Sequence, residues 1–399
     1  MFTYVFKDLT FTSVGGIIYR CFIGALILTF SVFYFYKNYK SFNLKTILPV
    51  SIYLVAGMIA TFVTPSIIHA NVSTKLYFES IFTLGMNAIS LFVFIDHISN
   101  KNEEYSYANI ICYVVVWFAF FLTISTYVFQ FKEIGKSFSE ADGWNYSVTS
   151  IFYIKTPYGY LLLLGSIFAT ILMFNENKFY FIFAPVYFAI NAFISRNKTS
   201  LLFIIILMLA SIILFVIKNW NRKRKEFTIV FSIIGGLVLI LSLLTFVEVL
   251  RFGIFNNFYY FIKTSIFENA RTVLLDRFDK WNAVFNNMKP FGYAFGYGEK
   301  IAPLAFNKYG TTLGDNIYVF TIGTGGIIKL ALLLFLIIFI YKTYISSDFN
   351  CYKKSLTIIL ISCIVLAGLF EDDYIYGFNF TSLFAMPIIF CSNKIILNN

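Results

Sequence analysis

Long hydrophobic runs recur along almost the whole chain, and they constrain its fold more than any other feature. We predict eleven of them, each close to the roughly 20 residues that a helix needs to cross a bilayer. They lie near residues 15–36, 46–65, 77–97, 108–130, 151–174, 179–195, 199–218, 227–247, 317–341, 355–371 and 376–397. The runs do not alternate as β-barrel strands do, and only 13% of the 399 residues are charged. We therefore expect an all-α fold, a polytopic integral membrane helical bundle.

The basic residues of the short loops predict how these spans are oriented. The densest run is Arg222 to Lys225 after the seventh span, and lysines also follow the first and ninth spans. With eleven spans, the positive-inside rule assigns all three loops to the cytoplasm. The loop 131–150, the turn at Arg196, residues 251–316 and the turn 371–373 then lie outside. Much of the net charge of +11 belongs to such anchors, so it does not indicate nucleic-acid binding.

The chain divides at one long polar stretch, residues 251–316. Connections between packed helices usually have about 2–8 residues. A loop of about 65 residues is therefore expected to carry function. We predict three parts: residues 1–250 with transmembrane helices 1–8, an extracytoplasmic catalytic loop 251–316, and residues 317–399 with transmembrane helices 9–11.

Within this loop, residues 270–288 predict an amphipathic helix that lies at the membrane interface. Its expected apolar face consists of Leu274, Phe278, Trp281, Phe285 and Met288. Arg277 lies at the edge of that face and is a neighbour of Trp281, four residues further on. Arg271 projects from another side of the helix.

Pro290 and Gly292 are expected to end this helix. The following turn, residues 291–298, combines flexible glycines with aromatic rings on which sugars, lipids or other helices can stack. Its glycines do not have the spacing of a dinucleotide-binding loop and follow no predicted strand.

The residues that commonly bind metals do not form a metal-site pattern. The two histidines, His69 and His97, are far apart, and no Asp-x-Asp pair occurs. The five cysteines, which lie in or beside hydrophobic runs, indicate neither disulfides nor a metal site. They are Cys21, Cys112, Cys351, Cys363 and Cys391. We expect no metal and no cofactor.

Several charged residues stand at or near membrane depth, where charges are costly. Arg196 and Lys198 occupy an outer turn, and outer arginines suit a lipid phosphate or pyrophosphate because guanidinium binds such groups in a bidentate way. For Arg196 a snorkelling turn residue is the structural alternative. For Arg251 the alternative is a pairing with Glu248 or with backbone carbonyls, and Arg20 has the same alternative.

Five short motifs follow one another in a characteristic order. They are Ser195-Arg196, Arg277-x-x-x-Trp281, the turn 291–298, Asp315-Asn316-x-Tyr318 and Gly325-Gly326-Ile327-Ile328. In this order, with a long outer loop between two late spans, they resemble the bacterial O-antigen polymerase (Wzy-type) and ligase superfamily. The resemblance covers about residues 190–335.

The resemblance implies a GT-C-like membrane glycosyltransferase of lipopolysaccharide biosynthesis in the bacterial inner membrane. Its partners would be oligosaccharide repeat units on undecaprenyl diphosphate, as donor and acceptor, besides membrane lipids and, as a candidate, a chain-length regulator. Arg196 and Arg277 would hold the diphosphate on the periplasmic side without a metal. Arg271 or Arg251 would assist. The other implied substrate-binding residues are Trp281, Gly296, Asn316 and Tyr318.

The ligase branch of this superfamily has a histidine where this chain has Asp315, which favours a polymerase over a ligase. A carboxylate can accept the proton of an attacking hydroxyl, so Asp315 is the first candidate base and Glu299 the second. Asp315-Asn316 can equally be the N-cap of the ninth span. A flippase for the same lipid-linked glycan is the alternative from another class, and the nearly charge-free middles of the spans favour an enzyme.

The predicted topology can be tested by labelling single introduced cysteines. Lys223→Cys is expected to react with a membrane-impermeant thiol reagent only after the membrane is opened, because the basic run faces the cytoplasm. Ser137→Cys, in the outer loop 131–150, is the control and should react in intact spheroplasts. Labelling of position 223 from outside would contradict the orientation.

Overall fold

The computed structural model describes a large part of the chain at the level of individual residues. The described residues are 36, 44–67, 72–99, 108–130, 134, 148, 155–220, 269–298, 301–307, 316–345 and 351–369. All regular structure in these ranges is helical, which confirms the all-α class. Within the described residues, five helices are long and apolar enough to cross a membrane: Ile47–Ser66, Cys112–Phe129, Tyr158–Asn175, Lys198–Trp220 and Ile317–Phe339. The total of eleven spans stays a prediction.

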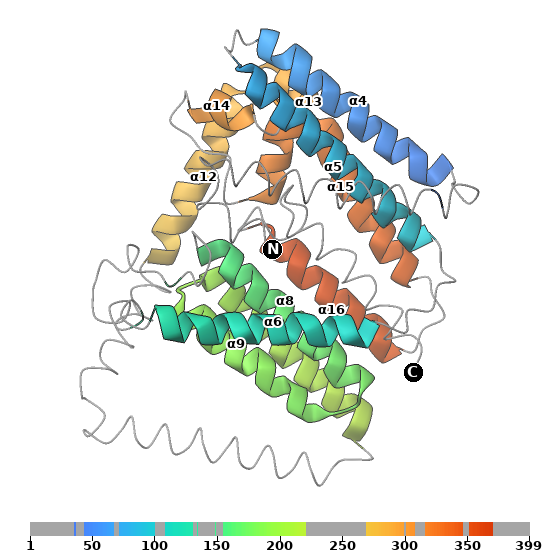
Figure 1. Cartoon of the computed structure of the whole chain (residues 1–399), viewed down its shortest axis with the longest axis vertical. Coiled ribbons are helices and arrows are strands. Elements are labelled where there is room, and N and C mark those ends of the chain that lie inside the picture. The colour runs from blue at the N-terminus through green and yellow to red at the C-terminus, as the bar shows by residue number, and fades with distance from the viewer. Residues whose placement is uncertain are drawn as a thin grey trace. The chain divides into compact units, whose positions relative to one another are not determined.

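Most predicted spans in the described ranges coincide with long helices (Figure 1). These helices are α4 (Leu44–Ile67), α5 (Thr74–Ser99), α6 (Ala108–Phe129), α8 (Lys155–Asn175), Lys198–Trp220 and α15 (Ile317–Ile345). The predicted spans 179–195 and 355–371 are helical but short. They correspond to η2 (Phe179–Ile182) with α9 (Phe183–Ile194), and to α16 (Cys351–Ala367). The predicted spans 227–247 and 376–397, and nearly all of 15–36, lie outside the described residues.

The chain forms two compact units. The first unit comprises residues 1–111, 152–160 and 278–399, and the second comprises residues 112–151 and 161–277. This partition reflects which parts of the chain pack against one another. The predicted division at residues 251 and 316 concerns membrane topology and stays a prediction.

The core of the second unit is the part of α8 from Leu161 to Phe174, whose residues are all buried. Its sequence is apolar on every side, as expected of a helix surrounded by others. A Cβ at Gly165 would lie 2.8 Å from the ring of Phe188 and 3.0 Å from the Cβ of Ala119. The glycine therefore lets α8 approach both α9 and α6 closely.

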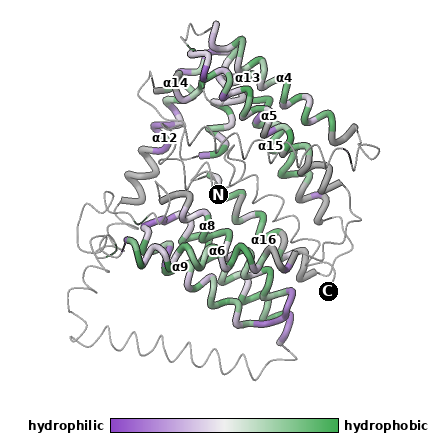
Figure 2. The backbone as a smooth tube through the Cα atoms, viewed as in Figure 1, coloured by the Kyte–Doolittle hydropathy of each residue, from purple (hydrophilic) through white to green (hydrophobic). Residues whose placement is uncertain are grey.

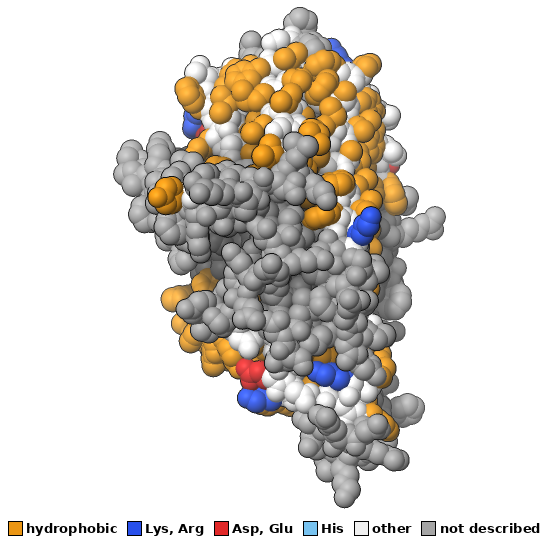
Figure 3. Space-filling model, turned by 90° about the vertical axis from the view of Figure 1, so that its right-hand side faces the viewer, with side chains coloured by type: hydrophobic (Ala, Val, Ile, Leu, Met, Phe, Trp, Pro, Cys, Tyr) orange, Lys and Arg blue, Asp and Glu red, His pale blue; other side chains and the backbone are white. Residues whose placement is uncertain are grey.

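In the first unit, α4 packs along α5, and their outer sides expose a broad apolar surface (Figure 3). On α4 the exposed residues include Ile52, Val55, Met58 and Phe62. Hydrophobic residues run along α4 and α15, whereas α12 (Asn269–Asn287) is more hydrophilic (Figure 2). Apolar surface of this extent is expected to face lipid or another protein rather than water.

The predicted amphipathic helix 270–288 is confirmed as α12, but its buried side differs from the prediction. Val284, absent from the predicted face, is fully buried, whereas Phe278 is 51% exposed. Val284 and Met288 belong to a hydrophobic cluster that includes Phe306 of α14 (Ala302–Asn307). The buried face of α12 is therefore rotated about the helix axis from the face that the periodicity predicts, because the neighbouring residues determine which side chains are covered.

The predicted turn 291–298 begins instead as a short helix, α13 (Pro290–Phe295). Pro290 is at the start of this helix, where the missing N–H costs nothing, and Gly292 is buried within it. α12 had already ended at Asn287, so the prediction that Pro290 and Gly292 end it was wrong in its detail.

Helix α15 is broken at Gly326, whose φ of 67° and ψ of −168° are not helical. Beside the break, the N–H groups of Tyr297 and Gly298 donate to the carbonyls of Gly323 and Thr324 at 3.0 and 2.9 Å. A Cβ at Gly326 would lie 2.2 Å from the carbonyl oxygen of Ala294. Two glycine motifs that are separate in the sequence thus pack directly against each other.

We expect Gly326→Ala to destabilise the protein by at least about 1–3 kcal/mol, because alanine is strained at this φ and its Cβ meets the backbone of α13. Thermal unfolding in detergent measures the effect. Gly85→Ala in α5 is the matched control, because its Cβ would meet nothing within 4 Å. This control should be neutral or stabilising by up to about 1 kcal/mol. Equal midpoints for the two variants would contradict the proposed packing.

Candidate functional site

The turn between α9 and the helix Lys198–Trp220 is closed by a set of backbone hydrogen bonds. The N–H of Asn197 donates to Ala192 O at 3.0 Å, and the N–H of Arg196 donates to Phe193 O at 2.9 Å. This pair of bonds defines a Schellman motif, in which the residue after the helix cap adopts the left-handed conformation. That residue is Arg196, with φ 54°.

Glycine is the usual residue at this position, because a side chain is strained there. Among the described residues, only Arg196 and Asn177 combine a side chain with a positive φ. Asn197 then caps the next helix, since its Oδ1 accepts the N–H of Ser200 at 2.9 Å. Ser195, Asn197 and Ser200 are buried. The turn therefore holds an arginine in a strained conformation, a feature that often accompanies function.

Three cations gather near this turn. The charges of both Arg196 and Arg277 act on the Lys198 ammonium, and all three residues belong to the second unit. Arg196 is half-buried, and burial lowers the pKa of its guanidinium from the usual value. Lys198 also begins a long helix, where the helix dipole disfavours cations and favours an anion. We call Arg196, Lys198 and Arg277 the cation cluster, and its chemistry suits an anionic ligand.

Trp281, predicted as a substrate-binding residue, has an unusual environment. Its side chain is partly buried against the cluster around Val284, and its ring meets Phe278 edge-on at 5.0 Å between ring centres. The indole nitrogen is buried and has no hydrogen-bond partner within the described structure. A buried donor of this kind is available to an oxygen acceptor.

Asn316 and Tyr318 make contacts within the protein. The Oδ1 of Asn316 accepts the N–H groups of Tyr318 and Val319 at 2.8 and 3.0 Å, so Asn316 is the N-cap of α15. Its Nδ2 donates to Leu369 O at 3.0 Å, and the Tyr318 hydroxyl donates to Val365 O at 2.9 Å. These bonds tie the start of α15 to the end of α16. The capping alternative for the Asp315-Asn316 motif is thus confirmed for its second residue.

Gly296 also has a packing role. Its φ is 72°, and a Cβ there would lie 2.3 Å from the backbone nitrogen of Gly325. Asp315, Glu299 and Arg251 lie outside the described residues, as does the side chain of Arg271 on α12. The roles predicted for these four residues stay predictions.

One residue with functional potential was missed by the sequence prediction. Lys329 lies near the middle of the apolar stretch Ile317–Phe339, and only 6% of its side chain is exposed. The expectation that the middles of the spans are nearly charge-free is therefore wrong for α15. A lone lysine within an apolar run is a signal for function, and it was available in the sequence.

Comparison of the chain with models of protein families, with curated proteins and with solved structures gives no match. The geometry of the site and the sequence motifs therefore carry the functional argument.

We expect Arg196→Gly to leave the thermal stability equal or higher, because glycine relieves about 1 kcal/mol of strain at this φ. The same substitution should weaken the stabilisation of the protein by inorganic pyrophosphate, since it removes one charge of the cation cluster. Thermal unfolding with and without pyrophosphate gives both quantities. Asn177→Gly is the control, because Asn177 has φ 53° and is not in the cluster. An unchanged pyrophosphate response in Arg196→Gly would contradict the role of the cluster.

Proposed function

We propose that this protein is a membrane glycosyltransferase, a polysaccharide polymerase of the O-antigen type. It would transfer a glycan from undecaprenyl diphosphate onto another lipid-linked repeat unit at the periplasmic face of the bacterial inner membrane. The observation that supports this most is the cation cluster, in which the charges of Arg196 and Arg277, from distant parts of the sequence, both act on Lys198. These are the two arginines that the motif pattern had assigned to the diphosphate.

The cation cluster fits the chemistry of a diphosphate leaving group. As the bond between the anomeric carbon and the diphosphate oxygen breaks, negative charge grows on that oxygen. Fixed cations stabilise this charge without having to reorganise. Guanidinium groups keep their charge at all physiological pH values and bind phosphate oxygens in a bidentate way. The proposed reaction accordingly uses no metal.

The attacking group would be a sugar hydroxyl of the acceptor. Its oxygen forms the new bond to the anomeric carbon, its proton passes to a carboxylate, and undecaprenyl diphosphate leaves with the bonding electrons. Asp315 is the proposed base and Glu299 the reserve. The capping role of Asn316 supports this assignment, because Asp315 is then not needed as the N-cap of α15.

Two other functions remain candidates. A ligase to lipid A–core shares the same motif order, although Asp315 stands where ligases have histidine. A flippase for the lipid-linked glycan is favoured by one observation, the buried Lys329 within an apolar helix, because transporters often place ionisable residues at this depth.

Deletion of the gene in its host, followed by electrophoresis of the surface glycan, distinguishes these functions. A single repeat unit on lipid A–core would support the polymerase. Loss of all glycan from the core would indicate the ligase or the flippase. Accumulation of polymerised glycan on undecaprenyl diphosphate, on the outer side of the membrane, would then single out the ligase. An unchanged glycan pattern would contradict the proposal.

Arg277→Lys is expected to lower polymerisation at least about tenfold, because lysine keeps the charge but loses the bidentate geometry. The length distribution of the glycan in the complemented deletion strain measures this effect. Asp279→Asn is the control on the same helix, since Asp279 is exposed and should tolerate the change. Full activity of Arg277→Lys would leave Arg277 as a structural charge only.

Asp315→Asn and Asp315→Ala should both insert normally and both be inactive, because each removes the proposed base while Asn316 keeps the cap. Asn316→Ala is the contrasting variant, which should lower stability by about 0.5–2 kcal/mol through loss of the cap. Thermal unfolding and the glycan pattern separate the two effects. If Asp315→Asn were normally active, the base would have to be sought at Glu299.

A further inference from the structure

Lys329 is a buried cation within the apolar stretch of α15, close to the break at Gly326. We propose that it is a positioning residue, whose ammonium holds the break in the shape that receives the turn after α13. That turn, residues 296–298, leads directly to Glu299, a candidate base. The role of Lys329 in the reaction therefore rests on the proposed function, whereas its role in holding the turn does not.

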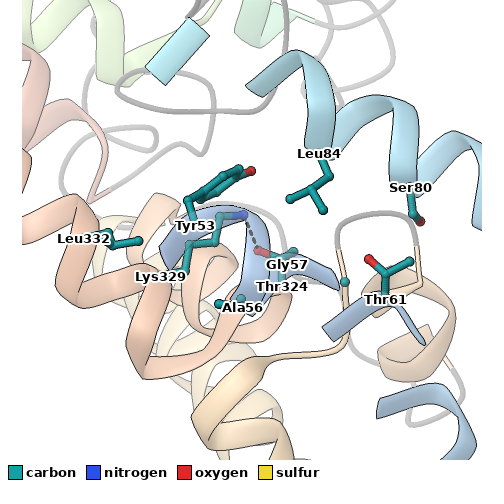
Figure 4. A pocket seen from close by; sticks show the side chains of 11 residues that line it. Tyr53, Ala56, Gly57, Thr61, Ser80, Leu84, Thr324, Lys329 and Leu332 are labelled. Atoms are coloured by element: carbon teal, nitrogen blue, oxygen red, sulfur yellow. Dashed lines mark hydrogen bonds between the residues drawn. The ribbon is translucent and has the colours of Figure 1, made fainter. Parts of the chain in front are cut away.

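The side chain of Lys329 runs back along α15, across the break (Figure 4). Its ammonium donates to the Thr324 hydroxyl at 3.1 Å. A Cβ at Gly325 would lie 2.1 Å from Cδ of Lys329 and 2.5 Å from its Cβ, so this glycine makes room for the lysine stem. The two halves of α15 are therefore linked by a side chain as well as by the backbone.

Thr324 connects this contact to the turn after α13. Its hydroxyl accepts from Lys329 and donates to Phe320 O at 2.8 Å, and its side chain is 1% exposed. Its carbonyl accepts the N–H of Gly298 at 2.9 Å. Because both its hydroxyl and its carbonyl are engaged, Thr324 has little freedom to move. The lysine and the turn are thus bound to the same residue.

The surroundings of the ammonium stabilise its charge at this position. The first half of α15 ends at the break, and its last carbonyls form the negative end of the helix dipole, which attracts a cation. The centre of the Tyr53 ring, on α4, lies 5.8 Å from the ammonium, within the range of a cation–π contact. A charge at membrane depth is costly without such partners. Removal of the charge would therefore loosen a contact that α4 and both halves of α15 share.

The cavity beside Lys329 argues against a ligand as the partner of this charge. It lies between α4, α5 and α15, is lined mainly by apolar groups and has room for about one water. The protein itself therefore supplies the partners of the ammonium. A lysine at this depth is explained by what it holds in place.

The test is hydrogen exchange of the full chain in phosphatidylcholine nanodiscs, read by mass spectrometry on the peptide that carries the N–H groups of Tyr297 and Gly298. Lys329→Met keeps most of the stem and removes the charge. It should speed the exchange of this peptide at least about tenfold, because a hydrogen bond from a charged group is lost. A peptide from the buried part of α8 should exchange as in the parent, which separates a local effect from a loss of overall stability.

Thr324 offers matched variants. Thr324→Val removes the acceptor and should speed the exchange as Lys329→Met does. The double variant should be no faster, because both changes remove one contact. Thr324→Ser keeps the hydroxyl and should keep the exchange slow. If Lys329→Met does not fold, the two Thr324 variants decide.

Thr321→Val is the control on the same helix. Thr321 is also fully buried, and its hydroxyl donates to Ile317 O at 2.6 Å, as that of Thr324 donates to the carbonyl four residues before it. The substitution therefore removes the same kind of bond at a position nearly one turn before the break. It should leave the exchange of Tyr297 and Gly298 unchanged.

Turnover tests the consequence for the reaction. The substrate is the undecaprenyl-diphosphate-linked repeat unit isolated from the deletion strain. Lys329→Met and Thr324→Val should lower the maximal rate per folded protein at least about tenfold, because a displaced catalytic group slows the reaction. Stabilisation by pyrophosphate should not change, since the cation cluster is intact. If the parent protein does not polymerise this substrate, the proposed function fails, and hydrogen exchange alone decides whether Lys329 holds the turn.

Two results would overturn the positioning of the turn by Lys329. One is an unchanged exchange of Tyr297 and Gly298 in Lys329→Met. The other is an equal acceleration by Thr321→Val and Thr324→Val. Normal turnover of a variant whose exchange is accelerated would overturn the role of Lys329 in the reaction.

Discussion

The backbone hydrogen bonds beside the break in α15 determine the arrangement of the first unit. A helix that is broken within an apolar stretch leaves carbonyls without partners, and such groups are costly away from water. Here the carbonyls of Gly323 and Thr324 accept the N–H groups of Tyr297 and Gly298. The bonds require close approach of two backbones, which explains glycine at positions 296 and 326. They also fix the part of α15 that carries Lys329, so the cavity depends on the same contact.

In the second unit, the corresponding constraint is backbone strain at a single residue. Arg196 is held at a positive φ by the hydrogen bonds that end α9 and by the cap that begins the next helix. These contacts do not involve the arginine side chain, so they fix the backbone of Arg196 independently of its guanidinium. The charges of Arg196 and Arg277 also act unfavourably on the Lys198 ammonium, a cost that an anion would relieve.

Local sequence signals predicted the helices well but predicted their contacts poorly. The periodicity of residues 270–288 correctly indicated α12, because helical spacing is a property of the segment itself. It gave the wrong edge of the buried stripe, since the partners at Phe306 and Tyr297 decide which residues are covered. Pro290 was assigned to a helix end although proline is equally common at a helix start. Only the chain after it, which forms α13, distinguishes the two.

The sequence by itself determined that the chain is helical and apolar enough for a membrane, because length and continuity of hydrophobic runs leave few other solutions. It also marked Arg196, Arg277 and the glycine motifs as unusual. Only the tertiary structure decided which of these residues meet. It joined the two glycine motifs, brought Lys198 within electrostatic reach of Arg196 and Arg277, and placed Lys329 in the lining of a cavity. The physical reason is that helix formation depends on neighbours in the chain, whereas these contacts depend on how distant helices pack.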